Sequence, residues 1–281
     1  MKLLALASDP ETFAVISGTD IIVDTSTIIS ASKENAEYVR DGVYIQHDNI
    51  MAEFNTKPSS TVTEFIYNTT NAIEVLTQRL EESGISPLIA SSSVISNAVI
   101  AGSKIAHIFG CAPDLNTWTG DVNPTPNIEE VGNLRVCGGH LHMSLEMESY
   151  AQGADLVKLL DYALTLKAVA DGVDNDATRR KFYGSAGSYR ETAYPNNTIG
   201  IEYRTPSNYW LKSTELMRQC YHSVVLAVEM FNSGERPYIG YEDAMRTAID
   251  TGNSVLATTI MEATSHPALQ VAAEEALHNV G

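Results

Sequence analysis

The stretch "RVCGGHLHMSLE", residues 135–146, predicts a strand with one polar face. Successive side chains on a strand point to opposite faces, so His140 and His142 would lie on the same side. The stretch also forms a Cys-x-x-His-x-His pattern that begins at Cys137. By itself it therefore allows three interpretations: a half-exposed strand, a catalytic base, or part of a zinc site.

Pairs of polar residues with the same spacing occur on two other predicted strands. Asp9 and Glu11 form one pair, and Glu202 and Arg204 form the other. Ile201 and Tyr203, on either side of Glu202, would face the opposite way, into a core. Such pairs predict a sheet with a polar floor, although an ordinary strand with one exposed face has the same alternation.

Three acids, Glu11, Glu53 and Glu202, lie on three predicted strands. Clustered carboxylates repel one another unless a positive charge lies between them. Hard oxygen ligands suit Mg²⁺ or Mn²⁺, and phosphate oxygens can complete the coordination. If the strands are neighbours, the sequence predicts a metal site for a phosphate-bearing ligand.

Basic residues are concentrated between residues 179 and 204. Five of the chain's 18 Lys and Arg residues fall in this segment: Arg179, Arg180, Lys181, Arg190 and Arg204. Gly184 and Gly187 lie among them, and small residues let guanidinium groups and backbone approach a phosphate closely. The alternative is a solvated helix end followed by a turn.

Composition excludes several classes of function. The chain has 281 residues and a net charge of −17, which argues against a broad nucleic-acid surface. It contains no apolar run of the ~20 residues that a membrane helix needs, and no GxGxxG or GxxxxGK[ST] motif. We expect a cytoplasmic protein with no membrane contact.

A zinc hydrolase is disfavoured. A regular strand sends Cys137 and His142 to opposite faces, and nothing places His107 or Cys111 nearby as further ligands. The chain also lacks the Gly-x-Ser-x-Gly elbow of a serine hydrolase. The three cysteines form no disulfide framework.

Helical signals are clearest in three places. Thr61 and Glu64 form a capping-box pattern that begins a helix ending at Gly84. Residues 151–171 and 214–232 also have helical spacing, and shorter helices follow. With strands between them and a Gly-, Pro- and Asn-rich loop at 109–127, the pattern predicts an α+β fold. We expect one catalytic domain over 1–281, with a sheet-bearing core at 1–212 and a helical C-terminal block at 213–281.

Six segments, in this order, resemble the phage carboxylate–amine ligases of the second type. They are "SDPETF" (8–13), "HDNIMAEFNTKPS" (47–59), "FGCAPDLNTWTG" (109–120), "RVCGGHLHMS" (135–144), "YGSAGSYR" (183–190) and "GIEYRTPSNYW" (200–210). That family is grouped with glutamine synthetase and glutamate–cysteine ligase. The resemblance covers about residues 5–210, and the helical tail matches less distinctively.

The resemblance implies a curved, mostly antiparallel sheet with helices on its outer face. The concave face would bind ATP and Mg²⁺, or Mn²⁺, and form an amide through an acyl phosphate. The implied metal ligands are Glu11, Glu53, Glu202 and His140. The implied ATP or phosphate contacts are His140, His142, Arg179, Arg190 and Arg204, and the implied catalytic residues are Arg190, Arg204 and Asp114. Asp9 and Asp114 would bind metal or orient the amine.

Two alternatives stay open. The same fold can serve a phosphotransferase related to guanidino kinases, or a non-catalytic phage assembly protein. The three acids argue against a degenerate site. The expected partners are a small-molecule or peptide carboxylate and an amine, and the family allows a homo-oligomer.

Overall fold

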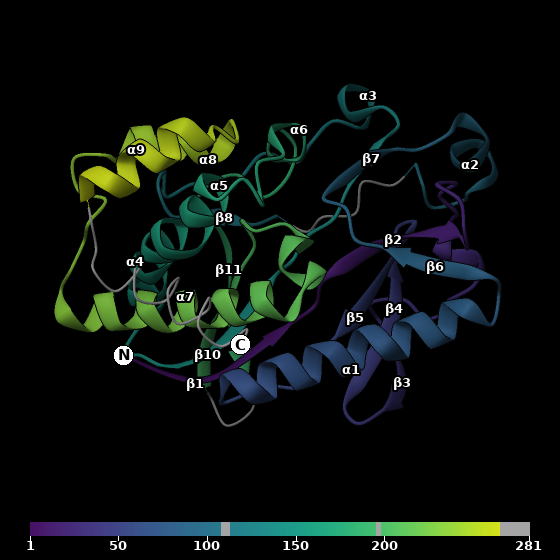
Figure 1. Cartoon of the computed structure of the whole chain (residues 1–281), viewed down its shortest axis with the longest axis horizontal. Helices are drawn as coiled ribbons and strands as arrows, with labels where there is room; N and C mark the ends of the chain where they lie inside the picture. The colour runs from purple at the N-terminus through teal and green to yellow at the C-terminus, as the bar shows by residue number, and fades with distance from the viewer. Residues whose placement is uncertain (108–112, 195–197, 265–281) are drawn as a thin grey trace.

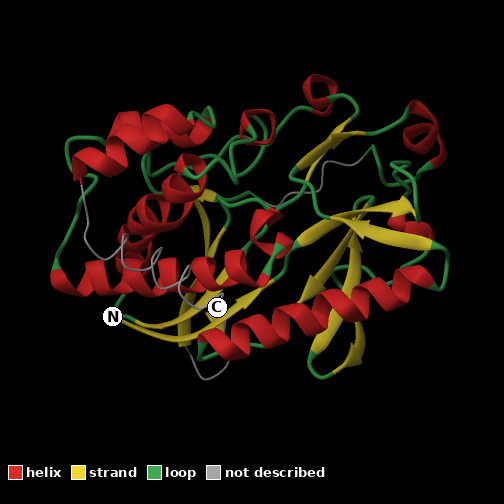
Figure 2. Cartoon of the chain, in the orientation of Figure 1, coloured by secondary structure: helices red, strands yellow, loops and turns green. Residues whose placement is uncertain are grey.

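The computed structural model describes residues 1–107, 113–194 and 198–264. Two five-stranded sheets form the centre of the molecule, and helices pack against them (Figures 1 and 2). The predicted α+β class is confirmed. The strands form two sheets instead of one, and the chain passes from the first to the second at Asp9-Pro10, where proline has no backbone N–H to donate.

The first sheet has the order β1-β10-β12-β11-β8 and is antiparallel throughout. Its strands are β1 (Lys2–Ser8), β10 (Leu141–Glu146), β12 (Thr198–Tyr203), β11 (Ser188–Tyr194) and β8 (Leu115–Asn116).

The second sheet has the order β3-β4-β5-β2-β6 and is also antiparallel. Its strands are β3 (Glu37–Arg40), β4 (Val43–Asp48), β5 (Met51–Asn55), β2 (Glu11–Ile16) and β6 (Ile85–Leu88). A separate pair joins β7 (Ser92–Val94) to β9 (Leu134–Val136).

The longer helices agree with the predicted segments. They are α1 (Val62–Glu81), α4 (Tyr150–Leu160), α7 (Thr214–Ser233), α8 (Glu242–Asp250) and α9 (Ser254–Thr264). A π-helical segment, η2 (Asp161–Leu166), joins α4 to α5 (Lys167–Ala170) without a break. The shorter helices are α2 (Asn97–Gly102), α3 (Ile128–Val131), α6 (Ala177–Arg180), η1 (Thr25–Thr27) and η4 (Asn208–Lys212).

The start of α1 follows its predicted chemistry. The Thr61 hydroxyl accepts a hydrogen bond from the Glu64 backbone N–H at 3.2 Å. The Glu64 carboxylate accepts the Ser60 backbone N–H at 2.8 Å, one residue earlier than a standard capping box. The turn after the helix ends at Gly84, whose φ of 71° suits glycine.

Each sheet has one face covered by helices. α4 contacts β11 and β12, and α7 contacts β1, while α1 lies along β4, β5 and β6 (Figure 1). Met143, Ile201 and Tyr203 are fully buried, as expected for side chains that point to the covered face. The residues between them on each strand therefore point to the opposite face. None of the described helices has the length and apolar character needed to cross a membrane.

Candidate active site

A row of polar residues crosses the uncovered face of the first sheet. His142 on β10 pairs in register with Glu202 on β12, and Glu202 pairs with Arg190 on β11. In-register neighbours on one face have side chains within contact distance. Arg190 Nη1 accordingly lies 3.4 Å from Glu202 Oε2. The i, i+2 alternation thus orients these side chains, and strand pairing brings them together.

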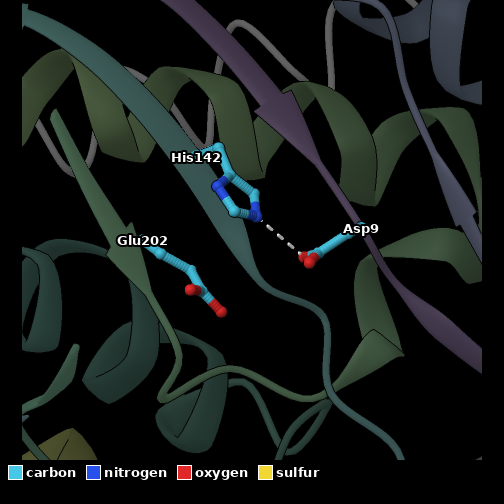
Figure 3. A group of neighbouring side chains, drawn as sticks. All are labelled: Asp9, His142 and Glu202. Atoms are coloured by element: carbon cyan, nitrogen blue, oxygen red, sulfur yellow. Dashed lines mark ion pairs between the residues drawn. The ribbon is translucent and has the colours of Figure 1, made fainter. Parts of the chain in front are cut away.

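Asp9 completes the first cluster, which we define as Asp9, His142 and Glu202. It follows β1, which pairs with β10, and its Oδ1 lies 3.1 Å from His142 Nε2 (Figure 3). One potential ligand atom from each residue lies within 4.8 Å of those of the other two. Two carboxylates and an imidazole are a donor set that suits a divalent cation.

Charge in the first cluster is balanced by its neighbours. Burial opposes ionisation of Asp9, but His142 and His140 hold its pKa well below the usual range. Burial likewise opposes the charged form of His142, yet Asp9 raises the pKa of this imidazole. Although burial acts against it, Arg204 and then His140 keep the pKa of Glu202 below its ordinary value. Both carboxylates therefore stay anionic beside basic groups.

Arg204, which follows β12, links this cluster to neighbouring side chains. Its guanidinium bonds the Glu202 carboxylate and the Tyr183 hydroxyl, and its Nε donates to Asp114 Oδ2 at 3.1 Å. The Tyr183 hydroxyl also lies 2.7 Å from His140 Nε2. The structure thus brings together Arg204, Asp114 and His140, three of the residues predicted from the sequence.

His140 contacts the first cluster through its other nitrogen. Its Nδ1 lies 3.2 Å from Asp9 and 3.6 Å from Glu202, and the ring is almost completely buried. Burial and then the Arg204 charge lower the pKa of His140, which favours a neutral ring. With both nitrogens close to protein atoms, this geometry favours a positioning role for His140. His142, whose side chain is more accessible, is therefore better placed to bind a metal than His140, the ligand predicted from the sequence.

The second cluster consists of Glu11, Asp48 and Glu53 on the second sheet. Glu11 on β2 pairs in register with Glu53 on β5, which pairs with Gln46 on β4. Asp48 lies two residues beyond Gln46 on the same strand face. Ligand oxygens of the three acids lie within 4.8 Å of one another, and Gln46 Nε2 donates to Glu53 Oε1 at 2.6 Å.

Lys33 supplies a positive charge to the second cluster. Its Nζ lies 2.5 Å from Asp48 and 3.4 Å from Glu53. Burial nevertheless raises the pKa of Glu11 to about 8, and Asp48 adds to this effect. Burial also raises the pKa of Glu53 well above its ordinary value, against the opposing effect of Lys33. One ammonium is thus too little charge for three acids, and a divalent cation would satisfy them better.

The two clusters meet where the chain passes between the sheets. Asp9 belongs to the first and Glu11 to the second, with Pro10 between them. The expectation of a single group formed by Glu11, Glu53 and Glu202 therefore needs correction. Glu202 belongs with Asp9 and His142, because β12 pairs in the first sheet, whereas Glu11 and Glu53 pair in the second.

The prediction that Arg179 binds phosphate does not fit the structure. Its side chain is fully buried. Its Nε, Nη1 and Nη2 donate to the backbone carbonyls of Cys137, Thr205 and Pro206 at 2.8, 2.9 and 2.9 Å. The guanidinium joins the segments before β10 and after β12, so it supports the site from behind.

The glycine pair before β10 has a steric reason. A Cβ on Gly138 would lie 2.2 Å from His140 Nε2, and one on Gly139 would lie 2.2 Å from the Ser207 carbonyl oxygen. Cys137 is fully buried and joins neither cluster. The zinc interpretation is therefore unsupported within the described residues, and Cys111 lies outside them.

Three residues of the site were not predicted from the sequence. Asp48 has a usable signal, because it stands two residues from Gln46 on a predicted strand. Lys33 has none, since it lies in an irregular turn segment. Tyr183 lies inside the basic segment, but only the folded structure shows that its hydroxyl joins His140 to Arg204.

Residues 133–270 match the family model described as phage phiEco32-like COOH.NH2 ligase, type 2. Over this segment the match agrees with the family resemblance found in the sequence motifs. The matched segment, just under half of the chain, contains His142, Glu202, Arg204 and Arg190. Asp9 and the second cluster lie before it. No curated protein gives a significant match.

Several solved structures match the chain, with low sequence identity and TM-scores below 0.5. A novel glutamine synthase homolog matches with a TM-score of 0.38 and 10% identity, covering 98% of this chain and 71% of its own. GmaS in complex with ADP matches with a TM-score of 0.41 and 9% identity, covering 98% and 68%. Plasmodium falciparum glutamine synthetase matches with a TM-score of 0.38 and 11% identity, covering 79% and 51%.

Proposed function

We propose that this protein is an ATP-dependent carboxylate–amine ligase that forms an amide bond through an acyl phosphate. The observation that carries the proposal is the pair of clusters on either side of Pro10, with Arg190 and Arg204 beside the first. Two groups of acids, the first beside two arginines and the second beside Lys33, suit a substrate rich in phosphate oxygens. The match to the ligase family supports the same reaction.

The donor atoms fit two divalent cations, with Mg²⁺ as the main candidate and Mn²⁺ as the substitute. Asp9, His142 and Glu202 would hold one, and Glu11, Asp48 and Glu53 the other. Glu53 Oε2 is a buried oxygen that accepts no hydrogen bond among the described residues, although Lys33 Nζ lies 3.4 Å from it. Such an oxygen favours a bound cation. Bound cations would neutralise the phosphate oxygens and so favour attack at phosphorus.

The protein's own groups have separate tasks in this proposal. Arg190 is partly exposed and can reach a transferred phosphate, while Arg204 is held in place by Glu202, Tyr183 and Asp114. A substrate carboxylate oxygen attacks the terminal phosphorus of ATP, and ADP leaves. The amine then attacks the acyl carbon, the carbon–oxygen bond to phosphate breaks, and phosphate leaves. No enzyme nucleophile is required.

Glu202→Gln tests the proposal. The purified protein is incubated with ATP, Mg²⁺ and panels of carboxylates and amines, and phosphate release is followed together with product masses. Wild type should yield an amide, ADP and phosphate. Glu202→Gln should lose more than about 100-fold in turnover while it keeps a cooperative unfolding transition, with the melting temperature somewhat lowered by the loss of the ion pair with Arg204. Glu191→Gln, an exposed acid on β11, is the matched control.

Three results would count against the proposal. A phosphorylated acceptor without an amide would indicate the phosphotransferase. Absence of ATP turnover with every panel would favour the assembly protein. Full turnover in Glu202→Gln would remove this residue from the metal site.

A further inference from the structure

A cavity of about 240 Å³ adjoins the Arg204 network. Asp114, Lys181, Phe182, Tyr183 and Ser188 are among its lining residues. Pockets for drug-sized ligands and cofactors usually measure about 300–1,000 Å³. This cavity is therefore sized for a smaller molecule than ATP.

The cavity shares two residues with the candidate active site. Tyr183 and Asp114 line it, and both bond Arg204. The Tyr183 hydroxyl also contacts His140 beside the first cluster. A molecule in the cavity would thus lie next to the groups that surround the reacting centre in the proposed ligase.

The lining carries one acidic group with unused acceptor capacity. Asp114 Oδ1 accepts a hydrogen bond from Asn123 Nδ2 at 2.9 Å, and Oδ2 accepts one from Arg204 Nε at 3.1 Å. A carboxylate has about four acceptor positions, so Asp114 can still receive an ammonium group. Ser188 Oγ lies beside it, 3.0 Å from the same Asn123 nitrogen.

The lining also carries one accessible positive charge. Lys181 is exposed, and its Nζ lies 5.1 Å from the centre of the Phe182 ring. Among the described residues, no carboxylate lies within ion-pairing distance of this ammonium. Arg180, the other basic lining residue, is buried in an ion pair with Asp174 at 2.8 Å. Lys181 is therefore the lining cation that is best placed to receive an anion.

We propose that this cavity binds the amine substrate as a free α-amino acid, with its ammonium on Asp114 and its carboxylate on Lys181. This proposal rests on the ligase function proposed above. A site with one acid at its inner end and one base on its exposed side complements a zwitterion. A simple amine has no carboxylate, so it would leave Lys181 without a partner.

The placement gives the amine a route to reaction. Asp114 can accept one proton from the ammonium, which frees the nitrogen lone pair to attack the acyl carbon. The new carbon–nitrogen bond forms as phosphate departs with the carbon–oxygen electron pair. The nitrogen then releases its second surplus proton to solvent, leaving a neutral amide.

The test compares amine acceptors that differ only in the carboxylate. Glycine is paired with methylamine, and L-serine with ethanolamine, using an acid that the panels have shown to be activated. Wild type should prefer the amino acid in each pair. Lys181→Met should lower kcat/KM for the amino acids about 10- to 100-fold, mainly through KM, and leave the simple amines unchanged. Lys212→Met is the control, because Lys212 is exposed and does not line the cavity.

Two outcomes would overturn the inference while leaving the ligase proposal intact. In one, wild type turns over simple amines as well as amino acids. In the other, Lys181→Met affects both members of a pair equally. If no turnover is found at all, titration calorimetry with an equimolar mixture of L-amino acids decides: heat of binding that Lys181→Met abolishes supports the inference, and absence of binding to wild type refutes it.

Discussion

The buried side chain of Asp161 offers a test of how the helical layer supports the candidate active site. Its side chain is fully buried on η2. It accepts hydrogen bonds from Trp118 Nε1 at 2.6 Å and from the Tyr203 hydroxyl at 2.7 Å. Tyr203 stands between Glu202 and Arg204 on the chain, and Trp118 follows the segment of Asp114. Asp161 therefore connects the helical layer to two parts of the active site.

Burial raises the pKa of Asp161 from 3.8 to about 7, against the opposing hydrogen bonds. The unfolded chain loses this proton first as pH rises, so the folded state binds more protons between these two values. Stability from this group is present at low pH and is lost as pH rises toward 7. A difference of about three pH units corresponds to about 4 kcal/mol, taken as an upper limit.

Asp161→Asn should remove this dependence, because the amide does not ionise. The variant also loses one hydrogen-bond acceptor, and this loss alone contributes a constant destabilisation of about 1 kcal/mol that does not depend on pH. The free energy of unfolding of the variant, relative to wild type, should then rise by about 2–4 kcal/mol from about pH 4 to about pH 8. Urea denaturation across this range measures it. Asp20→Asn, an exposed position, is the control. Parallel pH profiles for Asp161→Asn and wild type would refute the reasoning.

Two further predictions concern charged side chains. Arg179→Met should lower the free energy of unfolding by about 3–5 kcal/mol, because it removes three buried hydrogen bonds from a charged donor. The Thr205 and Pro206 carbonyls keep bonds from Arg180 and Gly139, whereas the Cys137 carbonyl loses its donor. Unchanged stability with weaker ATP binding would restore the predicted phosphate role of Arg179. Lys33→Met should tighten Mn²⁺ binding several-fold, because the Lys33 ammonium occupies a position where it competes with a cation for Asp48 and Glu53. Calorimetry measures the affinity, and weaker Mn²⁺ binding than in wild type would contradict this.

Local patterns in the sequence predicted the elements and the direction of many side chains. Period-two alternation correctly assigned Ile201 to the core and Glu202 to the opposite face. The capping residues Thr61 and Glu64 marked where α1 begins. These properties depend on a few neighbouring residues, and the α+β class followed from them. The roles of the site residues remain predictions.

Only the tertiary structure decided which strands are neighbours and in what register. Alternation shows which way Glu11, Glu53 and Glu202 point, but not that the first two share one sheet while the third lies in the other. The burial of Arg179 depends equally on carbonyls 26 to 42 residues away. Strand pairing and burial are set by long-range contacts that compete over the whole chain, whereas alternation and capping are set within a few residues.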